Sequence, residues 1–144
     1  MNNLKRIGAV AGVALSATLL ATTSAFATWS SSLTRVHVNF NSREWADSSY
    51  TQIHFKNCSA SDGARDYYSV TVELMRVDGF NKSFGSKTFS ECFSRGDGDV
   101  TSTGVWNNLP SGDYVFIIRA IGNQTSNYPS LSVADVIVDT TKAD

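Results

Sequence analysis

The segment LPSGDYVFIIRAI at residues 109–121 places a turn directly before the most apolar strand of the chain. Pro110 and Gly112 are typical turn residues, because proline fixes its own φ and glycine adopts backbone conformations closed to other residues. Within residues 114–121 only Arg119 is charged. We therefore expect this stretch to be a strand that is covered on both faces and crosses the middle of the core.

Six further segments alternate polar and apolar residues, and clusters of Gly, Asn, Asp and Ser separate them. This period of two is typical of half-buried strands. The segments are residues 35–40, 50–56, 68–74 (with Tyr68 facing inward), 87–93, 100–106 and 131–139. Residues 43–48 are expected to form a helical turn. The pattern predicts an all-β domain of seven antiparallel strands, folded as a sandwich or as a small Greek-key barrel.

A stretch from Trp106 through the turn and Tyr114 to Ala120 resembles one part of fibronectin type III and related immunoglobulin-like domains. In those domains a leucine, a Pro-Gly turn and a tyrosine precede a strand with alternating apolar residues. The resemblance implies an immunoglobulin-like β-sandwich, and it implies a tyrosine corner in which the Tyr114 hydroxyl hydrogen-bonds back to the turn backbone. It implies no activity, because one architecture serves many unrelated functions.

The first 27 residues have the pattern of a secretory signal peptide. Lys5 and Arg6 precede an uncharged apolar run, and Ala25-Phe26-Ala27 is a small-x-small cleavage signal. We expect cleavage after Ala27, a secreted extracellular protein, and a bacterial source because the run is short and rich in alanine. Residues 28–144 then form a single β-sandwich domain with a frayed polar tail.

The charge of residues 28–144 argues against two classes of partner. Two of the twelve basic residues and none of the thirteen acidic ones lie in the signal, so the remaining net charge is −3. No basic block is present of the kind that binds nucleic acid or an anionic membrane. We expect neither partner once the signal is cleaved.

Cys58 and Cys92 are the two cysteines of the chain. In an exported protein such a pair predicts one disulfide, with a single possible connectivity. A redox or catalytic thiol would instead need a Cys-x-x-Cys motif or a lone cysteine with a histidine partner. We therefore expect a structural bridge between Cys58 and Cys92.

The tripeptide Arg95-Gly96-Asp97 matches the motif that adhesive proteins present to integrins. Glycine and aspartate are also preferred in tight turns for conformational reasons alone, and a three-residue match is common by chance. The turn is the preferred interpretation. Asp97 and Asp99 form only half of a calcium-binding pattern, so no metal or cofactor is expected.

Trp29, Trp45 and Tyr128 are the aromatic residues that lie in the most polar surroundings. Exposed rings stack on sugars or anchor protein partners, and Trp29 and Trp45 are the better candidates for exposure, but packing in the core or at its rim is the preferred interpretation. No nucleophile motif or convergent set of catalytic groups is evident, so we expect no enzyme. The sequence predicts an extracellular domain that binds a glycan or a surface protein; the alternative is a small secreted effector, antibacterial or inhibiting a rival's enzyme.

Overall fold

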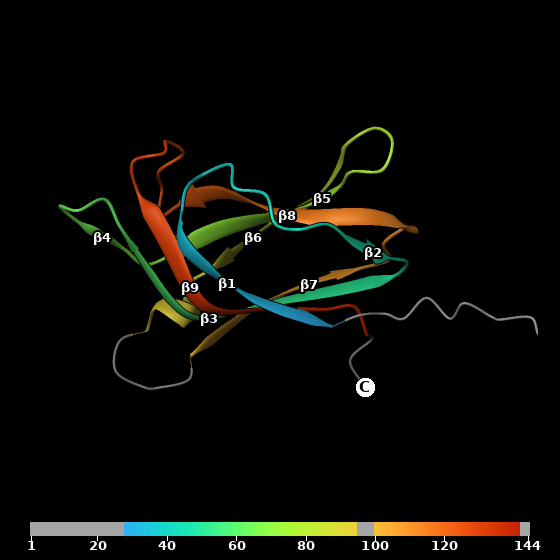
Figure 1. Ribbon diagram of the computed structural model, residues 1–144, viewed down its shortest axis with the longest axis horizontal. Coiled ribbons are helices and arrows are strands. Elements are labelled where there is room, and N and C mark those ends of the chain that lie inside the picture. Colours follow the sequence, from blue (N-terminus) through green and yellow to red (C-terminus); the bar gives the residue numbers. More distant parts are fainter. Residues whose placement is uncertain (1–27, 95–99, 142–144) are drawn as a thin grey trace, which may run out of the picture.

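The structure, a computed structural model, describes residues 28–94 and 100–141, which form two antiparallel sheets packed face to face (Figure 1). The predicted signal peptide with its expected cleavage site, and Arg95-Gly96-Asp97, lie outside the described residues. The first sheet contains β1 (Trp29–Val36), β9 (Ser130–Asp139), β3 (Tyr50–Ser61), β4 (Asp66–Tyr67) and β7 (Thr101–Asn107). It runs in the order β1–β9–β3, and the far edge of β3 pairs with β7 and then with β4.

The second sheet has the order β2–β8–β5–β6. Its strands are β2 (Trp45–Asp47), β8 (Gly112–Ile121), β5 (Val70–Arg76) and β6 (Lys82–Phe89), and a short 3₁₀ helix, η1 (Glu91–Phe93), follows β6. The all-β class and the sandwich are confirmed. The barrel alternative is wrong, because the described strands form two separate sheets.

The described part of the chain has nine strands, so the prediction of seven is wrong. Residues 43–48 contain β2 in place of a helical turn, because Trp45 to Asp47 pair with the start of β8. The short strand β4 pairs with only two residues of β3. Other boundaries differ as well. β1 spans Trp29–Val36 in place of 35–40, and β3 continues to Ser61 beyond residue 56. β6 begins at Lys82 and ends at Phe89, where η1 takes over the end of the expected strand 87–93.

The strand quoted from the sequence, β8, lies inside the second sheet as expected. Its residues Tyr114 to Ile118 are all buried, so both faces of the strand are covered. The space between the sheets is filled by rings that meet edge to face, with Phe55 at 5.0 Å from Phe89 and 5.6 Å from Phe116 between centroids. Such contacts add directional packing to the burial of apolar surface that holds the sheets together.

The Tyr114 hydroxyl donates a hydrogen bond to the carbonyl of Pro110, which is the bond that a tyrosine corner requires. The strand order, in contrast, departs from an immunoglobulin constant-type sandwich, in which the last two strands share a sheet. Here β8 belongs to the second sheet and β9 pairs with β1 and β3 in the first. The corner thus occurs within a different strand order.

β3 and β9 change face at the same place, and this change positions the candidate site. Up to the Lys56–Asp135 pair, the inward residues are Ile53, Phe55, Val136 and Val138; beyond it they are Cys58, Ala60, Val133 and Leu131. The alternation slips by one residue in both strands, and Asn57 has a left-handed φ of 52° at this point. Serines beyond the slip therefore lie on the outer face of the sheet.

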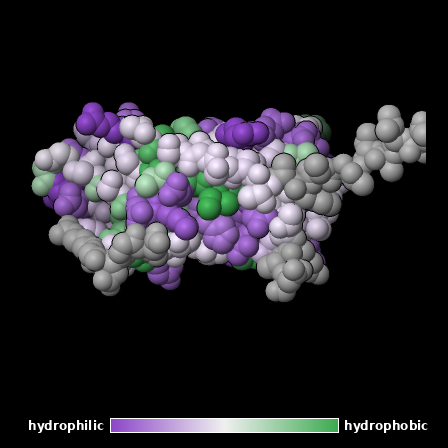
Figure 2. All heavy atoms as spheres, turned by 60° about the horizontal axis from the view of Figure 1, so that its bottom comes forward, coloured by the Kyte–Doolittle hydropathy of each residue, from purple (hydrophilic) through white to green (hydrophobic). Residues whose placement is uncertain are grey.

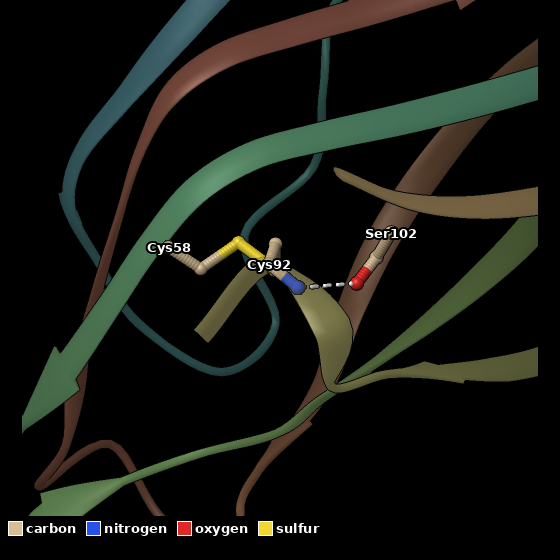
Figure 3. The surroundings of a disulfide bond; sticks show 3 residues. All are labelled: Cys58, Cys92 and Ser102. Carbon is tan, nitrogen blue, oxygen red and sulfur yellow. Dashed lines mark hydrogen bonds between the residues drawn. A yellow bond between two sulfur atoms is a disulfide. The ribbon is translucent and has the colours of Figure 1, made fainter. Parts of the chain in front are cut away.

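The disulfide joins this part of β3 to η1 (Figure 3). Cys58 and Cys92 have Cα atoms 5.1 Å apart, and the backbone N–H of Cys92 donates to the Ser102 hydroxyl at 2.8 Å. The predicted bridge is confirmed. At the other end of the chain Thr140 is buried and the Thr141 N–H donates to Asp139, so these two residues of the expected frayed tail are held in place.

Candidate functional site

The structure separates the three aromatic residues that the sequence singled out. Trp45 is only 7% exposed, so it packs in the core and is not available to a ligand. Trp29 is half-buried, lies 5.8 Å from Trp45 between ring centroids, and carries the Arg43 guanidinium 5.0 Å above its ring. Tyr128 is 81% exposed in the loop between β8 and β9. Because Trp29 pairs with Val138 at one end of β9 and Tyr128 precedes the other end, the three residues form no common site.

The end of the sandwich near Tyr128 contains a groove with a volume of about 380 Å³. Figure 2 shows that the surface turned forward from the bottom of Figure 1 is mainly hydrophilic or neutral, with hydrophobic side chains in small separate groups. The groove is lined by Arg35, Cys58, Ser59, Ala60, Ser61, Asp66, Tyr67, Tyr68, Phe93, Ser94, Ser130 and Ser132. Its lining is therefore rich in hydroxyl groups and contains both signs of charge.

Serines on adjacent strands form an ordered array in the groove. Ser59 of β3 lies opposite Ser132 of β9, and Ser61 lies opposite Ser130. Residues two apart on a strand are separated by about 7 Å, and partners across the strands by about 5 Å. All these serines face away from the core because Cys58, Ala60 and the corresponding residues of β9 face inward. The result is a flat set of hydroxyls that can donate and accept hydrogen bonds.

One wall of the groove is formed by β4 and the residues that follow it. Asp66 lies opposite Ser61, so its carboxyl group extends the row of hydroxyls onto a third strand. Tyr68, which the sequence placed inside, is 51% exposed and precedes β5, so that expectation is wrong. An exposed ring beside hydroxyl and carboxyl groups combines an apolar surface with hydrogen-bonding groups.

The turn that leads into β4 is held by Asp62. Its carboxylate accepts hydrogen bonds from the Tyr67 hydroxyl at 2.7 Å and from the N–H groups of Ala64 and Arg65 at 2.9 and 2.8 Å. These bonds, the one from Tyr67 foremost, lower the pKa of Asp62 to about 2. The same Tyr67–Asp62 hydrogen bond raises the pKa of Tyr67. The turn therefore stays hydrogen-bonded over the physiological pH range.

The Tyr67 ring rests against Gly122 at the start of the loop that contains Tyr128. A Cβ atom on Gly122 would lie 2.6 Å from the ring, and the residue has a φ of +59°. The N–H of Gly122 also donates to the carbonyl of Ser69 at 2.7 Å. Glycine is required here because both the close approach and the left-handed backbone disfavour a side chain.

The other walls of the groove are formed by β1 and by η1. Arg35 lies at the β1 side, where its backbone N–H donates to the Ser132 hydroxyl at 3.1 Å. Phe93 and Ser94 lie at the η1 side, directly after Cys92, which the disulfide ties to β3. The groove is thus bordered by two tyrosines, a carboxyl group, a guanidinium group and a covalently anchored turn.

Sequence reasoning missed this site, although a signal for it exists. The motif Ser-x-Ser occurs at Ser59–Ser61, just beyond the expected strand 50–56, and again at Ser130–Ser132, at the start of the expected strand 131–139. The pairing of the two strands, which a single sequence does not show, brings the motifs opposite each other. Val133 and Val136, three residues apart and both buried, also indicate the change of face in β9.

The arrangement can bind a polar ligand by hydrogen bonds. Among residues 28–94 and 100–141, no three His, Cys, Asp or Glu side chains come together to hold a metal ion. In the same ranges no helix is long and apolar enough to span a membrane. None of the known protein-family models matches this chain, and no curated protein is detectably similar to it in sequence.

Proposed function

We propose that this protein is an exported, non-enzymatic binding domain that recognises a glycan through the groove at the β4 and η1 end. The observation that supports the proposal is the paired serine array, with the exposed ring of Tyr68 beside it and Asp66 and Arg35 on opposite sides. A surface protein is the other ligand class that the sequence suggests.

Sugars have the chemistry that this lining complements. A pyranose ring has hydroxyl groups around its rim, which are both donors and acceptors, and C–H groups on its faces. The serine hydroxyls suit the rim because they too donate and accept. The Tyr68 ring suits a C–H face, since aromatic rings provide large apolar surfaces with little conformational entropy to lose.

The proposed location and fold relationship have separate support. The residue pattern 1–27 is that of a signal peptide, and the disulfide is compatible with an oxidising compartment outside the cytosol. The sandwich architecture and the Tyr114–Pro110 hydrogen bond support a relationship with immunoglobulin-like domains. Because the strand order differs from theirs, this support is limited to the tyrosine corner. We place the protein outside a bacterial cell.

Binding to glycans tests the proposal directly. Residues 28–144, with the disulfide oxidised, are sedimented with bacterial cell walls and insoluble polysaccharides and titrated with soluble oligosaccharides by calorimetry. We expect binding that is lost in Tyr68→Ala and weakened about tenfold in Ser61→Ala, because each removes a group that contacts the ligand.

Phe80→Ala is the matched control, since Phe80 is 98% exposed but lies between β5 and β6, outside the groove lining. It is expected to bind as the wild type does. If no glycan binds, or if Phe80→Ala and Tyr68→Ala reduce binding equally, the groove is not a glycan site.

Phe80 itself favours a second candidate, the secreted effector that acts on a protein target. The hairpin that bears it is fixed at its base by Arg76, which pairs with Asp78 at 2.6 Å, and by the Asp113 N–H, which donates to Asp78. A fully exposed phenyl ring on such a base is a suitable anchor for a protein pocket. Growth inhibition of neighbouring bacteria that Phe80→Ala abolishes, with glycan binding absent, would favour this function.

A further inference from the structure

The position of Arg35 in the groove is fixed by its own backbone. Arg35 has a left-handed φ of 50°, which is uncommon for a residue with a side chain. The register of β1 against β9 is irregular between Leu33 and Val36, and an irregularity of this kind redirects side chains at the edge of a sheet. The hydrogen bond from the Arg35 N–H to Ser132 ties the residue to the serine array.

Arg35 differs from Arg43, Arg76 and Arg119 in having no ion pair or ring contact among the described residues. Arg76 pairs with Asp78, Arg119 pairs with Glu73 at 2.8 Å, and Arg43 lies over the Trp29 ring. Within residues 28–94 and 100–141 no carboxylate pairs with the Arg35 guanidinium. A guanidinium that is positioned on a groove but not neutralised is suited to an anionic group of a ligand.

We propose that Arg35 binds the carboxylate of a hexuronic acid, so that the ligand is an acidic oligosaccharide. This inference rests on the proposed glycan-binding function. The guanidinium presents two parallel N–H donors, which match the two oxygens of a carboxylate. Ser132, whose hydroxyl already accepts from the Arg35 N–H, can donate its own proton to the same carboxylate.

The width of the groove sets the size of such a ligand. Arg35 is on β1 and Asp66 on β4, so β9 and β3 separate them, a span of about 14 Å between backbones. This span accommodates an oligosaccharide and not a single ring. The acidic group of the ligand lies at the Arg35 side, where the guanidinium attracts it.

The test compares an acidic oligosaccharide with its neutral counterpart. Probes are tetragalacturonate, its methyl ester, a glucuronate-containing hyaluronan tetramer and neutral tetrasaccharides of glucose and N-acetylglucosamine, each titrated into the oxidised chain. We expect a uronate to bind at least about tenfold more tightly than the uncharged probes, as one charge-assisted pair provides. Arg35→Gln is expected to remove this preference, and Arg35→Lys to restore part of it.

Arg65→Gln is the control variant, because Arg65 is an exposed arginine of the neighbouring turn that is outside the groove lining. It should keep the preference, which separates a specific contact from general charge attraction. Equal affinity for tetragalacturonate and its ester, or an unchanged preference in Arg35→Gln, overturns the inference. Binding of neutral glycans alone also overturns it but leaves the glycan function intact, whereas failure of every probe overturns both. Circular dichroism confirms that each variant is folded.

Discussion

The two ends of the sandwich use aromatic side chains differently. At the corner end, which contains β2 and the 109–112 turn, aromatic side chains are buried against one another. At the groove end, which contains β4 and η1, tyrosine side chains border an open surface. Trp45 contacts Trp29 and Phe116 at the corner end, whereas Tyr67 and Tyr68 line the groove. The aromatic residues of the two ends therefore have different consequences when they are changed.

Phe93 of η1 is buried at the groove end, but this end also depends on contacts other than aromatic packing. Beyond the change of face in β3 and β9, the inward residues of β3 are Cys58 and Ala60, which are much smaller than Phe55 before it. The disulfide to η1 and the Asp62 turn replace the missing packing with a covalent bond and local hydrogen bonds. Stability and binding should thus be separable by mutation, the former at the corner end and the latter at the groove end.

The largest loss of stability is expected from Trp45→Ala. The change removes a buried indole that contacts two other rings, and it leaves a cavity at the corner end. Large-to-small changes of this kind lower the free energy of unfolding by about 3–5 kcal/mol. Urea unfolding followed by circular dichroism measures it, with Tyr128→Ala expected to change stability by less than about 0.5 kcal/mol. Similar losses in both variants would contradict the contrast between packed and open aromatic residues.

Removal of the disulfide is expected to have the next largest effect. The double variant Cys58→Ala, Cys92→Ala releases η1 from β3 and frees a loop whose ends are 34 residues apart in sequence. The expected loss is about 2–5 kcal/mol. Native-state hydrogen exchange should show faster exchange at η1 and the groove end than in β8.

The glycan affinity of that double variant gives a second readout, because Phe93 and Ser94 follow the bridged Cys92 in the groove wall. We expect weaker binding even under conditions in which the variant is fully folded. Unchanged affinity would show that the η1 wall is not part of the binding surface.

A smaller effect is expected from Tyr114→Phe. The variant keeps the buried ring but removes the hydroxyl that donates to the Pro110 carbonyl. Loss of one such hydrogen bond lowers the free energy of unfolding by about 1–2 kcal/mol. Tyr68→Phe, the same chemical change at the groove end, is the control and should lower the free energy of unfolding less than Tyr114→Phe does, because Tyr68 is 51% exposed. The reverse result would contradict the assignment of the two ends.

The features that could be predicted from the sequence are those that one segment encodes by itself. β8 is recognisable because its apolar run follows a turn, and the bridge because two cysteines allow one pairing. β2 and β4 are too short to show a period, and they exist because Tyr114 and Ala60 offer them partners. Trp45 was a candidate for exposure for the same reason, since polar neighbours in sequence do not reveal a buried partner strand.

The candidate site was less accessible to prediction because it depends on two distant segments at once. The slip in alternation occurs at the same pair in β3 and β9, and only the pairing of Lys56 with Asp135 shows that the two slips coincide. The left-handed backbone at Arg35 likewise follows from the fit of β1 to β9 and not from its own sequence. The sequence therefore did not predict that the groove residues come together, although it contains each of their Ser-x-Ser motifs.

The smallest effect on global stability is expected from protonation of Asp62, which holds the turn at the groove end. The Tyr67 hydroxyl and the backbone N–H groups hold the pKa of Asp62 at about 2 when the chain is folded. A carboxyl group with a lowered folded-state pKa stabilises the fold above its ordinary value, and this contribution is lost as the pH falls from about 4 to about 2. Between these values the Tyr67–Asp62 bond should break and glycan affinity should fall.

NMR titration of the Asp62 carboxyl carbon and the Tyr67 ring measures this step at single residues. Tyr67→Phe removes the largest cause of the shift, so the pKa of Asp62 should rise toward its ordinary value and the affinity should begin to fall at a higher pH. The unfolding midpoint should hardly move, because the Asp62 carboxyl group is fully exposed to solvent. If Asp62 titrates at its ordinary value while Tyr67 is present, the turn is not fixed by this bond. Global unfolding in the same pH range would instead mean that the groove wall and the core respond to acid as one unit. That result would contradict the separation of the two ends.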